Sequence, residues 1–248
     1  MSDREESQEA PGPQGRQPIL LLPSVVTALA AVMIAVHLLR VLLFNDSTLD
    51  PLMLWGGFLP LRMVLPEAIP GGSLPLLWTP FTHGFLHGGW EHLLFNVAWL
   101  AIFGTPVARR YGAGPTLALF LCCTAAGAAA FAAVTVADGA VLVGASGGIA
   151  GLTGAAMRFV FQPVITTRHP ETGEVVVLGR RLATFRQLWR NTRSRYFILI
   201  WVALNAAVPL FPLFTGGAGV QIAWQAHLGG FLVGLLLVPL FERREGAA

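Results

Sequence analysis

The chain has 248 residues, of which 54% are hydrophobic and only 12% are charged, and its mean hydropathy is +0.65. A soluble domain carries about twice that share of charged residues, so the composition excludes an ordinary water-soluble globular protein. The formal charge of +3 is the difference between sixteen basic residues, all of them arginine, and thirteen acidic residues. Because these arginines lie in loops beside apolar runs, we expect contact with membrane lipid and no nucleic-acid partner.

Apolar runs of about 18 residues or more recur, which is the length that a bilayer core of roughly 30 Å requires. We therefore predict an all-α membrane protein, a bundle of six transmembrane helices within residues 19–241. We read the acidic, Pro/Gly-rich residues 1–18 as a disordered tail without a cleavable signal peptide, and residues 242–248 as a second tail. The second and fourth expected spans are short. The six are Ile19–Phe44, Trp90–Phe103, Ala113–Ala137, Ser146–Phe159, Tyr196–Phe214 and Ile222–Phe241.

The arginines orient these spans. Fourteen of the sixteen fall on one side of the expected membrane, and only Arg40 and Arg62 fall on the other. By the positive-inside rule, both termini are then cytoplasmic. The lysine-free, arginine- and alanine-rich composition is typical of a GC-rich bacterium, so we expect a multi-pass protein of a bacterial plasma membrane.

Two long connections lie on opposite sides of the membrane in this arrangement. Residues 45–89 form an outer loop that is rich in Pro and Gly but apolar, and we expect it to lie in the membrane interface. Residues 162–195 form a cytoplasmic insert, in which "RRLATFRQLWRNTRSR" fits a basic amphipathic helix on anionic lipid or a solvated charged loop equally well. The adjacent Cys122 and Cys123 lie inside an apolar run, where packing is their expected role.

A serine among glycines opens the fourth span. Gly144, Gly147 and Gly148 surround Ser146 in "VLVGASGGIAGLTGA" and allow a sharp turn and close backbone approach. The free N–H groups at a helix start favour developing negative charge, so Ser146 is a candidate nucleophile backed by its own amide. The alternative is a serine that only caps a tightly packed helix.

A histidine in the sixth span supplies a candidate base. His227 shares a helical face with Gly230 and Gly234 in "AWQAHLGGFLVG". Glycine faces on the fourth and sixth spans let the two helices touch, which would bring His227 within reach of Ser146. All thirteen acidic residues lie in tails, loops or span ends, so we expect a Ser–His dyad without a third member.

Histidines and an asparagine cluster before and within the second span, in "FTHGFLHGGWEHLLFN". His92 and Asn96 are four residues apart on one helical face and can donate hydrogen bonds to an oxyanion without an intramembrane charge. His83 and His87 fit ordinary interfacial histidines. The alternative is a zinc site, but the spacing is not HExxH and Glu91 is the only nearby carboxylate, so we expect no metal and no cofactor.

These motifs together resemble those of the rhomboid family of intramembrane serine proteases. The resemblance runs from about Trp78 to Gly234 and rests on "HGFLHGGWEHLLFN", "GASG" and "AHLGGFLVG", in family order on the second, fourth and sixth spans. It implies Ser146 as nucleophile, His227 as general base, and an oxyanion hole made by His92, Asn96 and the Ser146 amide. It also implies that His87 structures a water-accessible cavity.

Three positions depart from the family pattern. Thr79 follows Trp78 where an arginine is common, and Ala108 stands where a glutamate is often seen. Ala150 replaces an aromatic residue that would stack on the base, so we expect His227 to be held loosely or to lean on Trp224 or Gln225. These departures bear on loop anchoring and rate rather than on the reaction class.

The expected function is hydrolysis of peptide bonds in or next to transmembrane segments of other membrane proteins. The alternative within the same family is a non-catalytic protein that binds or retains membrane partners, which typically lacks the serine or the histidine. A transporter is disfavoured because ion-coupled transporters commonly place carboxylates inside their spans.

Overall fold

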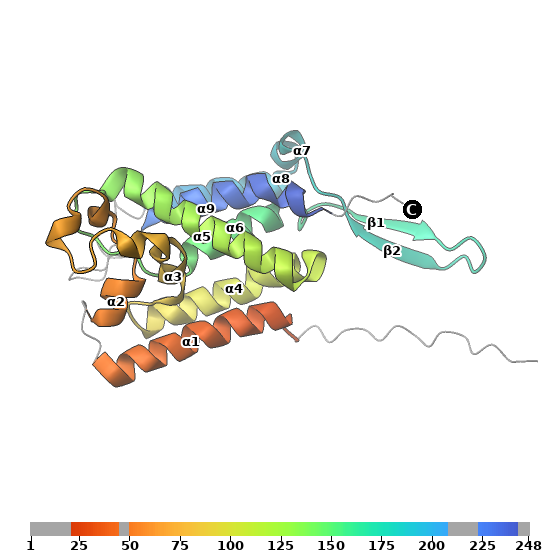
Figure 1. Ribbon diagram of the computed structural model, residues 1–248. Helices are drawn as coiled ribbons and strands as arrows, with labels where there is room; N and C mark the ends of the chain where they lie inside the picture. The colour runs from red at the N-terminus through yellow and green to blue at the C-terminus, as the bar shows by residue number, and fades with distance from the viewer. Residues whose placement is uncertain (1–20, 45–49, 208–222, 243–248) are drawn as a thin grey trace, which may run out of the picture.

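The structure is a computed structural model that describes residues 21–44, 50–207 and 223–242. It is a helical bundle with one two-stranded hairpin at one end (Figure 1). The tails expected at residues 1–18 and 242–248 lie outside this description, except for Glu242. The elements are α1 (Ser24–Phe44), α2 (Pro51–Gly56), α3 (Thr79–Thr82), α4 (Trp90–Tyr111), α5 (Ala113–Thr135), α6 (Ser146–Met157), β1 (Val164–Arg168), β2 (Val175–Arg180), α7 (Phe185–Arg190), α8 (Thr192–Ala207) and α9 (Trp224–Leu237), with short 3-10 turns between them.

Three helical segments in the described residues are long and apolar enough to cross a membrane. They are Ser24–Phe44, Ala113–Thr135 and Trp224–Phe241, and each falls on an expected span. Helix α4 has 22 residues and continues to Tyr111, eight residues past the end that we expected for the second span. We ended the expected span at Phe103, but the helix continues through Pro106 to Tyr111. The expected fifth span extends beyond Ala207 into residues outside the described part of the chain.

Helix α6 occupies the centre of the bundle. It packs against α9, α5 and α4, and every residue after Ser146 in it is buried. The contact with α9 is made by backbone: a Cβ on Gly230 would collide with the Gly147 carbonyl, and one on Gly234 with the Gly151 carbonyl. These glycines let the two helices approach closely, as the small-residue face of the sequence predicted.

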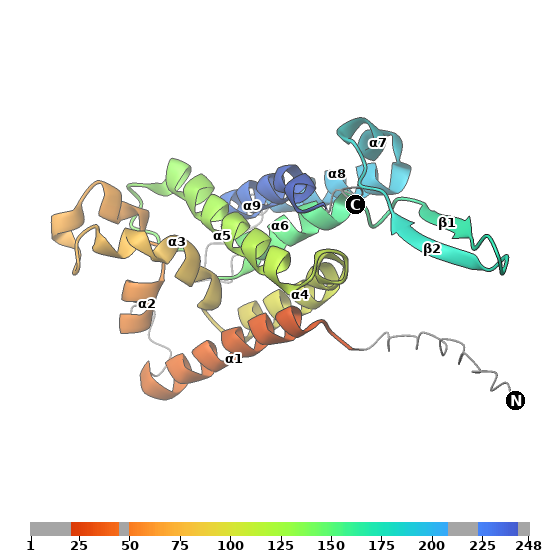
Figure 2. The ribbon, with the colours of Figure 1, turned by 45° about the vertical axis from the view of Figure 1, so that its right-hand side comes forward.

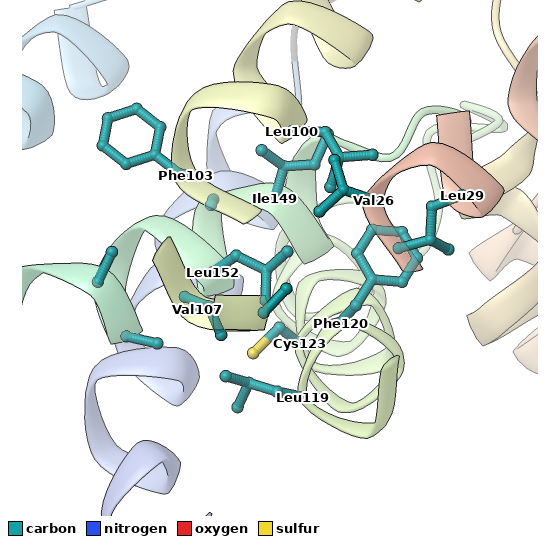
Figure 3. Packing of buried hydrophobic residues seen from close by; sticks show 14 of the residues in the cluster. Val26, Leu29, Leu100, Phe103, Val107, Leu119, Phe120, Cys123, Ile149 and Leu152 are labelled. Carbon is teal, nitrogen blue, oxygen red and sulfur yellow. The ribbon is translucent and has the colours of Figure 1, made fainter. Parts of the chain in front are cut away.

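Apolar side chains fill the space on the other sides of α6. Figure 3 shows residues of α1, α4 and α5 gathered beside Ile149 and Leu152 of α6, among them Phe120 and Cys123 of α5. Cys123 is fully buried and Cys122 is exposed, and neither forms a disulfide. The packing role expected for the cysteines therefore holds for Cys123.

Two arginines organise the segment between α1 and α4, which lies at the Ser146 end of the bundle. Arg40 and Asp50 form a buried ion pair at 2.6 Å, and the Asp50 carboxylate also caps α2. Arg62 is fully buried and donates to the carbonyl oxygens of Leu54, Pro70 and Gly72 at 3.0, 2.8 and 2.7 Å. This loop is thus anchored although Thr79 replaces the arginine of the family pattern.

The insert at the opposite end is a hairpin followed by a short helix. β1 and β2 pair antiparallel and extend away from the bundle, as Figures 1 and 2 both show. Of the two interpretations of "RRLATFRQLWRNTRSR", one continuous amphipathic helix is wrong: helix α7 begins after a Thr184 capping box and ends at Arg190, and the extended backbone of Asn191 separates it from α8. We predicted no strands here; neither "VITTR" nor "VVVLGR" alternates apolar and polar residues, and nearly every residue of the hairpin is exposed.

Arginines also fasten this insert to the helices. Arg110 pairs with Glu242 at 2.9 Å and donates to the Arg180 carbonyl. Arg158 donates to the carbonyl oxygens of Ala183 and Leu235 at 2.6 and 2.8 Å. The ends of α4, α6 and α9 are therefore joined to the base of the hairpin.

The glycine contact between α6 and α9 predicts a large effect of one methyl group. We expect Gly234→Ala to lower the free energy of unfolding by about 1–3 kcal/mol or more, because backbone atoms must move to admit it. Gly114→Ala in α5 is the matched control, since nothing lies within 4 Å of a Cβ at that position. Thermal unfolding in detergent measures both variants, and equal stability would show that the helices are not in backbone contact.

Candidate active site

Ser146 is the first residue of α6 and follows a turn that only glycine adopts readily. Gly144 has φ +117°, in the region that disfavours a side chain. Its N–H donates to the His83 carbonyl at 2.9 Å, which fixes the turn against the preceding loop. Ser146 remains half-buried while the rest of α6 is buried, so its hydroxyl stands at the end of the helix rather than in its core.

The side chains of Ser146 and His227 meet between α6 and α9. His227 Nε2 lies 2.7 Å from Ser146 Oγ, inside the distance that proton transfer requires. The two residues are 81 positions apart in the sequence. Their proximity follows from the backbone contact between Gly147, the residue after Ser146, and Gly230, about one turn after His227.

A third side chain, which we did not predict, binds the other ring nitrogen of His227. Asn205 of α8 places its Oδ1 2.7 Å from His227 Nδ1, and its own Nδ2 donates to the Trp201 carbonyl at 2.8 Å. An amide oxygen only accepts, so Nδ1 carries the proton and Nε2 faces Ser146 as a lone pair. The arrangement is that of a nucleophile, a base and a group that orients the base.

An aromatic contact holds helix α8 against α9 near His227. Trp201 stacks on Phe231 of α9 with ring centroids 4.4 Å apart and planes 19° from parallel. Trp201 is one helical turn before Asn205, and its carbonyl is the acceptor of the Asn205 amide. The stack therefore sets the position from which Asn205 reaches His227.

Two expectations about His227 need correction. First, the His227 ring has a side-chain partner in addition to Ser146. Second, that partner is Asn205, and not Trp224 or Gln225 as we expected. No aromatic ring stacks on His227 among the described residues, and Ala150 is buried in the core. A signal for Asn205 existed, since a polar residue inside an apolar span usually faces the bundle, but our prediction considered only acidic residues as partners of His227.

His92 and Asn96 lie on α4 beside the serine turn. A Cβ on Gly144 would lie 2.6 Å from His92 Nε2, so the absent side chain makes room for this ring. Asn96 Nδ2 donates to the His92 carbonyl at 2.7 Å, and the same amide carries a second hydrogen. The structure thus brings His92 to Ser146, while the hydrogen bond of Asn96 that it records is made within α4.

His83 and His87 are both buried and belong to the loop that leads into α4. His83 Nδ1 lies 2.9 Å from the Thr79 carbonyl, and burial lowers its pKa to about 4. The His87 ring packs against His92 with centroids 5.1 Å apart, and its carbonyl accepts from Arg40. Burial, and then the neighbouring His92 and His37, lower the pKa of His87 to about 3. Both rings are therefore neutral at pH 7.

The histidines do not converge as metal ligands. Within the described residues, no three side chains of His, Cys, Asp or Glu come close enough together to hold a metal ion. The polar side chains recorded near Ser146 are those of His92 beside the Gly144 turn, of His227, and of Asn205 behind His227.

Comparison with known proteins gives one consistent family. A family model described as the rhomboid domain matches residues 75–244. Relatives named rhomboid protease GlpG are 29% identical over 161 residues in Serratia proteamaculans and 28% identical over 173 residues in Yersinia pestis. These alignments cover 65% and 69% of this chain but 47% and 50% of the relatives. The chain therefore spans about half the length of the curated relatives that it matches.

The buried neutral histidines predict that acid destabilises the fold. An unfolded histidine takes up a proton near pH 6.5, whereas His87 in the folded chain does not until about pH 3. The unfolded state therefore binds more protons as the pH falls, and we expect His87 alone to cost about 2 kcal/mol between pH 7 and pH 5.

Thermal unfolding of His87→Gln and wild type across this range measures that slope. The loss should be smaller in His87→Gln than in wild type. His169→Gln, at an exposed histidine after β1, is the control and should keep the wild-type slope. A wild-type slope in His87→Gln would mean that His87 does not stay neutral in the folded chain.

Proposed function

Because the chain belongs to the rhomboid family, we propose that it is an intramembrane serine endopeptidase. It hydrolyses peptide bonds in or next to transmembrane segments of other membrane proteins, and it uses no cofactor or metal. The observation that carries this proposal is the hydrogen-bonded series Ser146–His227–Asn205, in which each group is 2.7 Å from the next.

The proposed membrane arrangement has six spans: α1, α4, α5, α6, α8 and α9. Helix α6 has 12 residues and is about 18 Å long, shorter than the bilayer core of about 30 Å. Ser146 then lies below the outer surface, at the floor of a water-accessible dip. The arginine distribution places both termini in the cytoplasm, and the bacterial plasma membrane is the proposed location.

The domain division follows from these spans. Residues 19–241 form the protease domain, with the outer loop 45–89 in the interface and the insert 162–195 in the cytoplasm. Exposed apolar side chains of the outer loop support its interfacial position; they include Trp55, Met63, Leu74 and Leu77.

The first chemical step is attack by Ser146. His227 Nε2 takes the hydroxyl proton while Oγ forms a bond to the scissile carbonyl carbon. The carbonyl oxygen becomes an oxyanion that accepts hydrogen bonds from the Ser146 amide, His92 and Asn96. All three donors are neutral, which avoids a fixed charge at membrane depth.

The second half of the reaction releases both products. His227 gives its proton to the leaving amine as the peptide C–N bond breaks, and the acyl group stays on Ser146. A water molecule then loses a proton to His227 and attacks the ester, which frees the new carboxyl end and restores the Ser146 hydroxyl. Throughout, Asn205 accepts from Nδ1–H and keeps the ring in the productive orientation.

Labelling with a fluorophosphonate serine probe in detergent tests the nucleophile. We expect covalent labelling and cleavage of a transmembrane substrate by the wild type, and neither by Ser146→Ala, because no other serine in residues 21–44, 50–207 and 223–242 has a recorded hydrogen bond to a histidine. His227→Ala should lose both as well. If Ser146→Ala is labelled at the wild-type rate, another residue is the nucleophile; if wild type is inert, the non-catalytic binding or retention function takes precedence.

Asn205→Ala tests the positioning of the base. We expect kcat to fall by about 10-fold to 100-fold, a part of the roughly 10²–10⁴-fold that a general base contributes, with KM little changed. Asn205→Asp keeps an acceptor at the same place and should retain more of kcat than alanine does. Equal kcat in both variants, at an unchanged thermal midpoint, would leave Asn205 with a packing role only.

A further inference from the structure

A hollow beside α7 lies at the opposite end of the bundle from Ser146 and plays no part in the proposed reaction. Its volume is about 570 Å³. A smaller hollow of about 260 Å³ adjoins it, shares Gln162 and Gln187, and adds Arg181. The polar side chains that line the larger one are those of Gln162, Thr184, Arg186, Gln187, Arg190 and Asn191.

The lining is cationic without a compensating acid. Arg186 and Arg190 are four residues apart, so their guanidinium groups share one face of α7. The sequence contains no Asp or Glu from Val175 to Phe241, and no carboxylate lines either hollow in the described residues. Such a site attracts an anion that accepts several hydrogen bonds.

One donor in the wall already lacks an acceptor. The Nε2 atom of Gln162 is buried and has no hydrogen-bond partner in the described part of the chain. A buried unpaired donor is costly, and a turn of the Gln162 amide toward the hollow would let an acceptor held by Arg186 and Arg190 satisfy it. The wall thus offers a neutral donor beside two cationic ones.

The neighbouring face of α7 is aromatic and exposed. Phe185 is 51% and Trp189 is 60% exposed, and they too are four residues apart. Buried Leu188 fastens α7 to the bundle, and α8 begins two residues after Arg190. If α8 crosses the membrane as proposed above, α7 lies where aromatic rings commonly meet the lipid headgroups.

We propose that this hollow binds the phosphate of an anionic phospholipid headgroup in the cytoplasmic leaflet. Arg186 and Arg190 donate to the phosphate oxygens, Gln162 and Gln187 donate beside them, and Phe185 and Trp189 contact the glycerol and acyl region. A free phosphate ion shares the headgroup chemistry but makes no use of the aromatic face. The inference rests on the proposed membrane arrangement and not on catalysis.

Native mass spectrometry of the full chain in detergent, titrated with phosphatidylglycerol, tests the site. We expect Arg186→Gln/Arg190→Gln to weaken binding by about tenfold or more, since each arginine near an anionic lipid contributes about fivefold. Arg168→Gln/Arg193→Gln removes the same charge from residues outside the hollow and should change binding less than twofold. Phosphatidylcholine, which has no net charge, should bind all three forms equally weakly.

Three results would overturn the proposal. Equal weakening of lipid binding in both double variants would show that binding depends on the overall charge and not on this hollow. Unchanged binding in Arg186→Gln/Arg190→Gln would show that these two arginines do not bind the headgroup. Competition by inorganic phosphate at the concentration of the lipid would assign the hollow to a soluble anion. Fluorophosphonate labelling of each variant is read separately, so a chain that binds lipid but is not labelled loses the protease function and keeps this site.

Discussion

The backbone contact between α6 and α9 is the constraint on which the rest of the site depends. Gly230 lies against the Gly147 carbonyl and Gly234 against the Gly151 carbonyl, at positions where no side chain fits. Ser146 and His227 lie close to these contacts in their helices. The spacing of α6 and α9 therefore also sets the distance between the Ser146 hydroxyl and the His227 ring. In lipid there is little hydrophobic force between helices, so close packing of this kind is also a main source of their association.

The polar groups around Ser146 share a second property, which is that none of them is a carboxylate. Asn205 contacts His227 through an amide oxygen, and in the proposed mechanism His92 and Asn96 offer neutral donors. An ionised aspartate in the place of Asn205 would have to be desolvated inside the bundle, at a cost of several kcal/mol unless it were paired. An amide performs the orienting role without that cost, although it stabilises a protonated histidine less.

Arginine serves at both ends of the bundle, with different partners. At the Ser146 end, Arg40 and Arg62 are buried and use their donors on one carboxylate and several loop carbonyls. At the other end, Arg110 and Arg158 join the helices to the hairpin. Arg186 and Arg190 line a hollow whose lining contains no carboxylate in the described residues. This hollow therefore indicates an anion from outside the chain, which the surroundings of the other four arginines do not.

What the sequence determined by itself is local and periodic. Apolar length located the helices, glycines at intervals of three and four located the face by which α6 meets α9, and Ser146 and His227 could be placed near each other because both lie on those faces. What only the tertiary structure decided is the set of contacts between segments that share no pattern. Asn205 reaches His227 because Trp201 stacks on Phe231, Arg62 holds a loop that the family pattern anchors elsewhere, and the insert begins with a hairpin for which no element was predicted. Each of these depends on which groups meet across distant parts of the chain, and periodicity records only which face of its own helix a residue occupies.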